Sequence, residues 1–351
     1  MTAQLAEHTL ARPSERFAER ITELFNAGMP QDANWLSLLL KNQLDQLPLP
    51  GAGQTLQRWR ALAAVAQFDL SLTKLYEGHT DALAILAEIN EPNAHIAQGA
   101  WCVWAAEAPG ARTRIHPAGG ACVRLSGAKH WCSGAMTGDH ALLTAWADDG
   151  TGPYLVAIEL DQPGWAMDAS QWKAVGMASS MSVNVTFDGA KGRCVGGPGQ
   201  YLSRPGFWHG GAGLAACWYG GAVGIALVLR ASLLGKNSDG AGYKLSALGK
   251  VELALEETSA TLRQAAVWID THPTQDASRL ALTTRLSAER CAKLVIDEAG
   301  KAMGATPFCL NEKFAQAVAD LPVFIRQSHA DRDFAALGER SLVRLGTAWT
   351  L

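Results

Sequence analysis

The sequence has no block of like charges, no closely spaced cysteine pair and no recognisable leader. Its 30 basic residues nearly balance its 33 acidic residues, and the net charge is −3. This balance favours neither nucleic acid nor an anionic membrane as the main partner. The seven cysteines are an odd number without a C-x-x-C pair, which is typical of reduced thiols and not of a disulfide framework. Because the N-terminus lacks the apolar region of a signal peptide, we expect a cytoplasmic protein.

Motifs of three common enzyme classes are also missing. The nine histidines are scattered without H-E-x-x-H or H-x-x-x-H spacing, and no G-x-S-x-G occurs. The sequence therefore predicts neither a metal site nor a serine hydrolase. No G-x-G-x-x-G follows a strand either, since the glycines at 210–213 open a helix after a proline-containing connector. A Rossmann fold is not expected.

One long uncharged run, residues 210–229, has the length of a membrane span. It contains six glycines, and no second run of this kind occurs in the chain. Small residues at this density also let a helix lie close to its neighbours inside a bundle. We expect a buried helix and no membrane span.

Residues 119–190 differ from both flanks. Short alternating apolar runs at 121–125, 140–146, 154–160 and 182–187 are separated by Gly, Pro, Asn and Asp. This pattern predicts strands joined by turns. Eight of the twelve tryptophans fall between 101 and 218, which suits either a wall for a planar ligand or plain packing in a core or subunit interface.

The flanks have helical spacing. Apolar residues three or four apart predict a helix from Thr55 to Leu72, and the letters EGH at 77–79 are expected to break the chain before a shorter helix at 82–89, which Glu91-Pro92 ends. Further helices are predicted at 210–234, 247–270 and 278–303, with a last one from about Leu321. The predicted fold class is α+β. Its three parts are an N-terminal helical domain (1–97), a central β-barrel-like domain (98–196) and a C-terminal four-helix bundle (205–351).

Four motifs in the middle domain appear in a known order. They are AAEAPGAR at 105–112, GAKHWCSG at 127–134, QPGW at 162–165 and VGMASSMS at 175–182. In order and spacing they resemble the β domain of the acyl-CoA dehydrogenase flavoproteins. The resemblance implies FAD bound between the β domain and the bundle, a small-molecule substrate such as an acyl thioester, and a homodimer or homotetramer.

The resemblance also implies cofactor-binding residues. Trp131 and Ser133 match the family's pair that contacts the flavin, by the indole ring and by a hydrogen bond, with Cys132 between them. Ala105 and Ala106 lie in the loop that approaches the flavin. Ala106 stands where the family has Thr, and Arg112 where it has Ser, so flavin binding there would depend on backbone N–H groups.

The family's phosphate-binding residues are matched less closely. Arg230 in RASLLGK (230–236) is one residue out of place from the family's Arg-x-x-Phe-Gly. Gly300 in DEAGKAMGA (297–305) matches the loop that meets a neighbouring subunit's FAD. The two residues are the candidates for holding the dinucleotide part of the cofactor.

The family's catalytic Glu has no counterpart in IRQSHADRDFAALGER (325–340). The remaining candidates are Asp333 and His329, which together with Arg326 have the spacing of one helix face. A relocated base such as Asp333 would make the chain an acyl-CoA-dehydrogenase-like FAD enzyme acting on a C–H bond. His329 at the flavin edge would instead suit a monooxygenase or oxidase of the same fold. A degenerate, non-catalytic binding subunit is the third alternative, and an interhelical salt-bridge cluster would explain the same residues.

Overall fold

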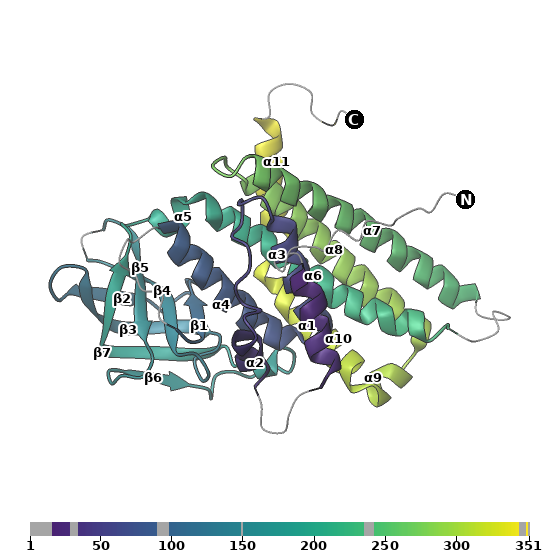
Figure 1. Cartoon of the computed structure of the whole chain (residues 1–351), viewed down its shortest axis with the longest axis horizontal. Coiled ribbons are helices and arrows are strands. Elements are labelled where there is room, and N and C mark those ends of the chain that lie inside the picture. The colour runs from purple at the N-terminus through teal and green to yellow at the C-terminus, as the bar shows by residue number, and fades with distance from the viewer. Residues whose placement is uncertain are drawn as a thin grey trace, which may run out of the picture.

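The computed structural model describes residues 16–28, 34–89, 98–148, 150–234, 242–343 and 349. A sheet domain lies at one end of the molecule and long helices lie at the other, with the N-terminal helices between them (Figure 1). The mixed α+β fold class predicted from the sequence is confirmed.

Four helices precede the sheet: α1 (Phe17–Asn26), α2 (Trp35–Lys41), α3 (Thr55–Phe68) and α4 (Leu70–Ile89). The predicted break at 77–79 is wrong, because α4 continues through it. The true break lies at Asp69, whose backbone is extended and whose carboxylate accepts the Leu72 N–H at 2.7 Å, as helix-capping residues do. Gly78 remains helical where α4 meets β1, its Cβ position being 3.9 Å from the Val103 nitrogen. The proposed stop at Glu91-Pro92 lies outside the described residues.

Seven strands make up the sheet: β1 (Trp101–Trp104), β2 (Thr113–Pro117), β3 (Cys122–Cys132), β4 (His140–Trp146), β5 (Pro153–Glu159), β6 (Trp165–Asp168) and β7 (Val183–Val195). The strand order is β1-β4-β2-β3-β7-β5, and β5 also pairs with β4. That pairing closes the sheet into a barrel around its own core, which includes Leu125, Leu143 and Val185. The predicted barrel-like domain therefore stands, although β1, β2 and β6 were not predicted as strands.

The chain then returns to helices: α5 (Gln200–Ser203), α6 (Pro205–Ala231), α7 (Gly242–Thr271), α8 (Ser278–Met303), α9 (Thr306–Leu310), α10 (Glu312–Phe324) and α11 (Asp331–Leu342). The bundle consists of α6, α7, α8 and α10. The predicted last helix from Leu321 is wrong as a single element. It breaks after a 3-10 turn at Ile325–Gln327, where Ser328 is extended and Ala330 has a φ of +47°.

Helix α6 is the one described helix that is long and apolar enough to cross a membrane. It packs against α3 and α8, and 67% of its most apolar window is buried within the molecule. Gly220 permits this packing, since a Cβ there would lie 2.4 Å from the Ala63 carbonyl oxygen. The run of small residues is therefore explained by helix packing in the shared helical core.

Candidate flavin site

A cavity of about 660 Å³ lies where the barrel, α4 and the C-terminal helices meet. Its volume is that of a typical small-molecule site. Of the residues predicted from the sequence, the cavity is lined by Ala105, Ala106, Trp131, Ser133, His329 and Asp333. The fold thus brings Ala105 and Asp333, nearly 230 positions apart in the sequence, to the same cavity.

Trp131 has an unusual backbone and an exposed ring. Its φ is +58°, a left-handed conformation that is costly for a bulky residue, and the β3–β7 pairing shifts between Lys129 and Cys132. Its side chain lines the cavity with 54% of the residue exposed. An apolar ring held out of the core by a strained backbone is typical of a ligand wall.

Three serine hydroxyls form a chain beside this ring. Ser133 and Ser182 share a hydrogen bond of 2.6 Å, and Ser182 and Ser180 share one of 3.0 Å. All three line the cavity. Hydroxyls both donate and accept, so this row can bind the polar edge of a heterocycle.

The loop that carries Ser180 and Ser182 is fixed to α10. Asp320 accepts the Met177 N–H at 2.5 Å. Gly176 lies so close to α10 that a Cβ would meet the Ala319 carbonyl oxygen at 1.9 Å. Burial raises the pKa of the Asp320 carboxyl, and the Met177 N–H partly offsets this. The glycine of the VGM motif is thus explained by close backbone approach.

Beneath Trp131, a polar cluster connects β3 to β4. Lys129 is buried and donates to Glu107 at 2.7 Å and to the Thr144 hydroxyl at 2.6 Å. Burial would raise the pKa of Glu107, but hydrogen bonds from Lys129, Thr144 and Trp146 outweigh it and lower that pKa. Glu107 therefore has a structural role, since it holds β3 and β4 together through Lys129 and Thr144.

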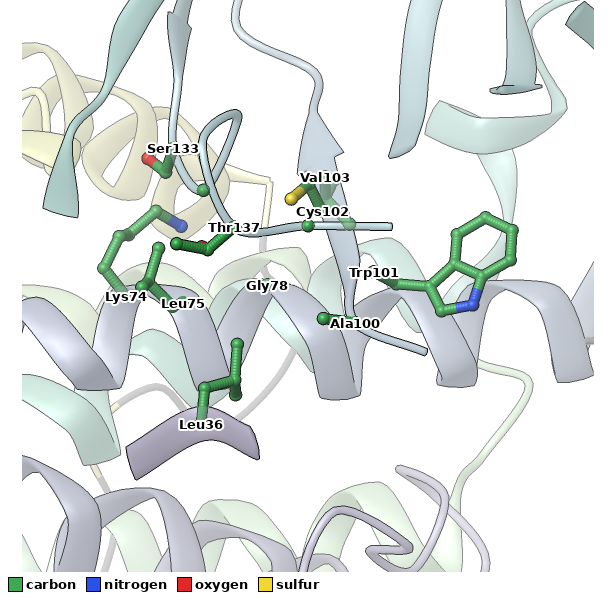
Figure 2. A pocket seen from close by; sticks show the side chains of 12 residues that line it. Leu36, Lys74, Leu75, Gly78, Ala100, Trp101, Cys102, Val103, Ser133 and Thr137 are labelled. Carbon is green, nitrogen blue, oxygen red and sulfur yellow. The ribbon is translucent and has the colours of Figure 1, made fainter. Parts of the chain in front are cut away.

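The turn after β3 packs on α4, as Figure 2 shows for Ser133 and Thr137 beside Lys74 and Leu75. A Cβ on Gly134 would lie 2.9 Å from the Cys102 sulfur, so this contact is tight. The Trp104 indole N–H donates to the Ser133 carbonyl at 2.9 Å. The position of Ser133 is consequently fixed by both β1 and α4.

His329 faces the cavity from the break before α11 and Asp333 from the first turn of α11, and not from one helix face as predicted. Asp333 accepts the His329 backbone N–H at 3.1 Å and the Ser328 hydroxyl at 3.4 Å. Its other oxygen lies 3.4 Å from the His329 Nδ1. Because the carboxylate reaches back to the His329 N–H just before α11, it stabilises the break itself.

Arg326, the third member of that group, also lines the cavity and pairs with Glu289 on α8 at 2.8 Å. The salt-bridge alternative therefore describes Arg326 well. His329 pairs instead with Asp333, four residues along, and its side chain is 55% exposed at the cavity.

Three other predicted cofactor residues do not line the cavity. The Cys132 side chain points into the barrel core, where burial raises the pKa of its thiol. Arg230 lies exposed in the last turn of α6, and Gly300 on α8 packs against Phe308. Their cofactor contacts remain predictions. Arg112 lies over the Trp146 ring at 4.5 Å.

The sequence reasoning missed part of the lining. On α4 the missed residues are Lys74, Glu77 and Asp81, and from α5 onward they include the aromatic residues Tyr201, Phe207 and Trp208 and the cations Arg204 and Arg285. The spacing of three and four on α4 was available as a signal, but the predicted break at 77–79 hid it. Among the described residues, no three His, Cys, Asp or Glu side chains are grouped closely enough to hold a metal ion.

Comparison with known proteins finds this architecture among solved structures only. No protein-family model and no curated protein matches the sequence. Solved structures do match over nearly the full length. Glutaryl-CoA dehydrogenase from Mycobacterium smegmatis matches with a TM-score of 0.78 at 15% identity, over 97% of each chain. The chain has the acyl-CoA dehydrogenase fold.

Two other similar structures contain a flavin. KijD3, in complex with FMN and a dTDP-linked amino keto sugar, has a TM-score of 0.76 at 18% identity, over 96% of each chain. TdsC from a Paenibacillus species, in complex with FMN and indole, has a TM-score of 0.71 at 18% identity, over 93% of this chain and 94% of that one. TdsC is described as a dibenzothiophene monooxygenase.

The residues present fit a flavin ring. An exposed indole offers an apolar face, and three connected hydroxyls offer donors and acceptors beside it. A planar heterocycle with a polar edge needs both. The fit rests on this chain's own geometry as well as on the fold.

Proposed function

We propose that this chain is a flavin-dependent oxidoreductase whose isoalloxazine ring binds between Trp131 and the serine row. The observation that carries the proposal is the strained, exposed Trp131 beside Ser133, Ser180 and Ser182 in one cavity. Trp131 would cover the apolar face of the ring, and the hydroxyls would bind its heteroatoms. Backbone groups at Ala105 and Ala106 line the same cavity and leave room where larger side chains would intrude.

The cofactor supported best is FMN in place of the predicted FAD. KijD3 and TdsC are described with FMN. Arg230 and Gly300, the residues expected to hold the dinucleotide part, lie outside the cavity of this chain. Identification of the released flavin by chromatography tests the choice, because FMN and FAD elute separately after the protein is denatured.

Among flavin reactions, the site favours oxygenation of a small molecule. A reduced flavin supplies the two electrons with which O₂ can deliver one oxygen atom to a substrate. His329 is the cavity's imidazole, and Asp333 is positioned to orient it. Imidazole can donate and accept protons near neutral pH, so His329 would hold or supply the proton that such a reaction requires.

The electrons would come from a separate reductase, since the sequence has no strand-linked G-x-G-x-x-G for a nicotinamide nucleotide. The decisive experiment supplies reduced FMN to the chain with O₂ and candidate aromatic and amine substrates. Oxygen incorporation that depends on His329 supports the proposal. Substrate left unoxidised while reduced FMN is consumed would contradict it.

A second candidate is a dehydrogenase acting on an acyl thioester, and the cavity's carboxylates favour it. Asp333 lies in the cavity, although two hydrogen bonds already engage one of its oxygens. Removal of the proton beside a thioester needs such a base. Anaerobic bleaching of the bound flavin by an acyl-CoA would select this candidate over the first.

The homo-oligomer and the cytoplasmic location also remain proposals. Leu253 and Val267 on α7 are 61% and 62% exposed, and an apolar surface of this kind suits contact with another subunit. Light scattering of the purified protein tests the first, and cell fractionation tests the second.

A further inference from the structure

Because α4 is continuous, Lys74, Glu77 and Asp81 follow one another at helical spacing and line the cavity together. Lys74 lies at the Ser133 end of the helix. Asp81 is seven residues further along, which is about 10 Å at the rise of an α-helix. Glu77 and Asp81 therefore lie progressively farther from the proposed flavin end, and Asp81 lies at a second end of the cavity.

That second end has aromatic walls. Tyr201, Phe207 and Trp208 line it, with ring centroids 5.5 Å apart for Tyr201 and Phe207 and 5.3 Å apart for Phe207 and Trp208. On α6, Gly210 makes room for the carboxylate, since a Cβ there would lie 2.9 Å from Asp81 Oδ1. Aromatic faces beside a carboxylate attract organic cations.

Asp81 differs from the other charged residues of the cavity. Each of the others contacts a protein partner through its side chain: Lys74 with Glu77 (2.7 Å), Arg204 with Glu88 (2.6 Å), Arg326 with Glu289 (2.8 Å), Arg285 with the Gln327 carbonyl (2.5 Å), and Asp333 with Ser328 and His329. Among the described residues, Asp81 has no hydrogen bond or ion pair. The cavity's lysine and arginines thus each have a protein partner, although Arg204 Nε has none, and the Asp81 carboxylate is left for a ligand.

The surroundings of Asp81 make its negative charge costly unless a positive group binds beside it. Burial and the neighbouring Glu77 carboxylate raise the pKa of Asp81, and the positive charges of Arg204, Arg58 and Lys74 only partly oppose this. An unpaired carboxylate in a partly dry site is costly, and a bound cation with N–H donors removes much of that cost. Asp81 would repel a ligand carboxylate or phosphate, and Arg204, which lies over the Tyr201 ring at 5.2 Å, already pairs with Glu88.

We propose that this end of the cavity binds the ammonium group of an amine substrate, with Asp81 as its counter-ion and Tyr201, Phe207 and Trp208 around it. The inference rests on the proposed function, because it assigns the substrate class of the same site. It places the substrate's charged group about two helical turns from the flavin end, so that the remainder of the molecule extends toward Trp131.

Two ligands of matched shape test the inference: cyclohexylmethylamine, a cation at neutral pH, and cyclohexylmethanol, its neutral counterpart. Binding is followed by the fluorescence of the cavity tryptophans, both in the flavin-free chain and after FMN loading. We expect the wild-type chain to bind the amine at least about tenfold more tightly than the alcohol. Equal affinities would overturn the inference without any mutation.

Asp81→Asn keeps the shape and removes the charge. It should lose the preference for the amine while its affinity for the alcohol stays unchanged. The matched control is Asp297→Asn, which removes a surface carboxylate paired with Lys301 and should retain the preference. A preference that survives in Asp81→Asn would overturn the assignment of Asp81.

The two proposals fail separately. Flavin retention without any preference for the amine would overturn this inference alone. A preference for the amine in a chain that retains no flavin would overturn the proposed function, and with it the reaction in which the amine takes part, while leaving the cation site as measured.

Discussion

The imidazole of His329 lies 3.4 Å from the Asp333 carboxylate, between Nδ1 and Oδ1, across the break that separates α10 from α11. The same carboxylate accepts the His329 backbone N–H through its other oxygen. One acidic residue therefore fixes both the main chain and the ring of the histidine. Asp333 thus stabilises the chain break that points His329 toward the cavity, and it also orients the imidazole ring.

His329→Gln should lower substrate oxygenation by about 100-fold or more while FMN binding stays near the wild-type value. The glutamine retains polarity but cannot exchange protons near neutral pH. Single-turnover oxygenation with reduced FMN measures the effect. His272→Gln, at the residue that follows the end of α7, is the matched control. Unchanged turnover in His329→Gln would remove the histidine from the reaction.

Asp333→Asn tests whether Asp333 positions His329 or is itself the catalytic base. If Asp333 acts through His329, the double variant should be no slower than His329→Gln, because interacting residues do not add. Additive losses would contradict the positioning role. If Asp333 were instead a dehydrogenase base, Asp333→Asn alone should abolish anaerobic flavin reduction by an acyl-CoA.

Gly176→Ala tests the loop that carries Ser180 and Ser182. A Cβ at 176 would lie 1.9 Å from a backbone oxygen of α10, so the loop or the helix must move. We expect a destabilisation of about 1–3 kcal/mol and weaker FMN retention. Thermal unfolding and gel filtration after FMN loading measure the two effects. Gly189→Ala, where no atom lies within 4 Å of the added carbon, controls for loss of glycine, although its φ of +84° adds strain. Normal stability and flavin content in Gly176→Ala would show that the close approach is unimportant.

Glu107 should make the stability of the barrel depend on pH in the acidic range. The pKa of this carboxyl is lower in the folded chain than its ordinary value of 4.5, so the unfolded chain binds the proton more readily. Its stabilisation is present above about pH 4.5 and is lost as the pH falls through the folded pKa. Glu107→Gln should lower stability near neutrality by about 1–3 kcal/mol, because Lys129 loses a charged partner. Denaturant unfolding at neutral and acidic pH measures this. A Glu107→Gln chain with the acid sensitivity of the wild type would contradict it.

Sequence reasoning succeeded where the signal was local. Alternation at 140–146 and the turn residues around it predicted β4 to the residue, and the spacing at 278–303 did the same for α8. The resemblance of GAKHWCSG to the flavoprotein motif pointed to Trp131 and Ser133, and both line the cavity, although their contact with a flavin stays a prediction.

It failed where packing between elements or one side-chain hydrogen bond decides the structure. Gly78 predicts a break when considered alone, yet packing of α4 against β1 keeps it helical. Ser328 to Ala330 predict continuation of a helix, yet the Asp333 carboxylate stabilises a break there. Both errors concealed site residues: the first concealed Asp81, and the second gave His329 and Asp333 the wrong geometry. Tertiary contacts outweigh helix propensities of about 1 kcal/mol per residue.

Flavin binding against Trp131 is tested by measuring how much flavin the protein retains. The purified chain and Trp131→Ala are each loaded with FMN, and the flavin that co-elutes with the protein is measured by absorbance. We expect about one FMN per wild-type chain and an affinity about tenfold lower in Trp131→Ala, with Trp268→Ala on α7 behaving as the wild type. Free elution of all FMN from the wild-type chain, or equal retention by Trp131→Ala, would contradict it.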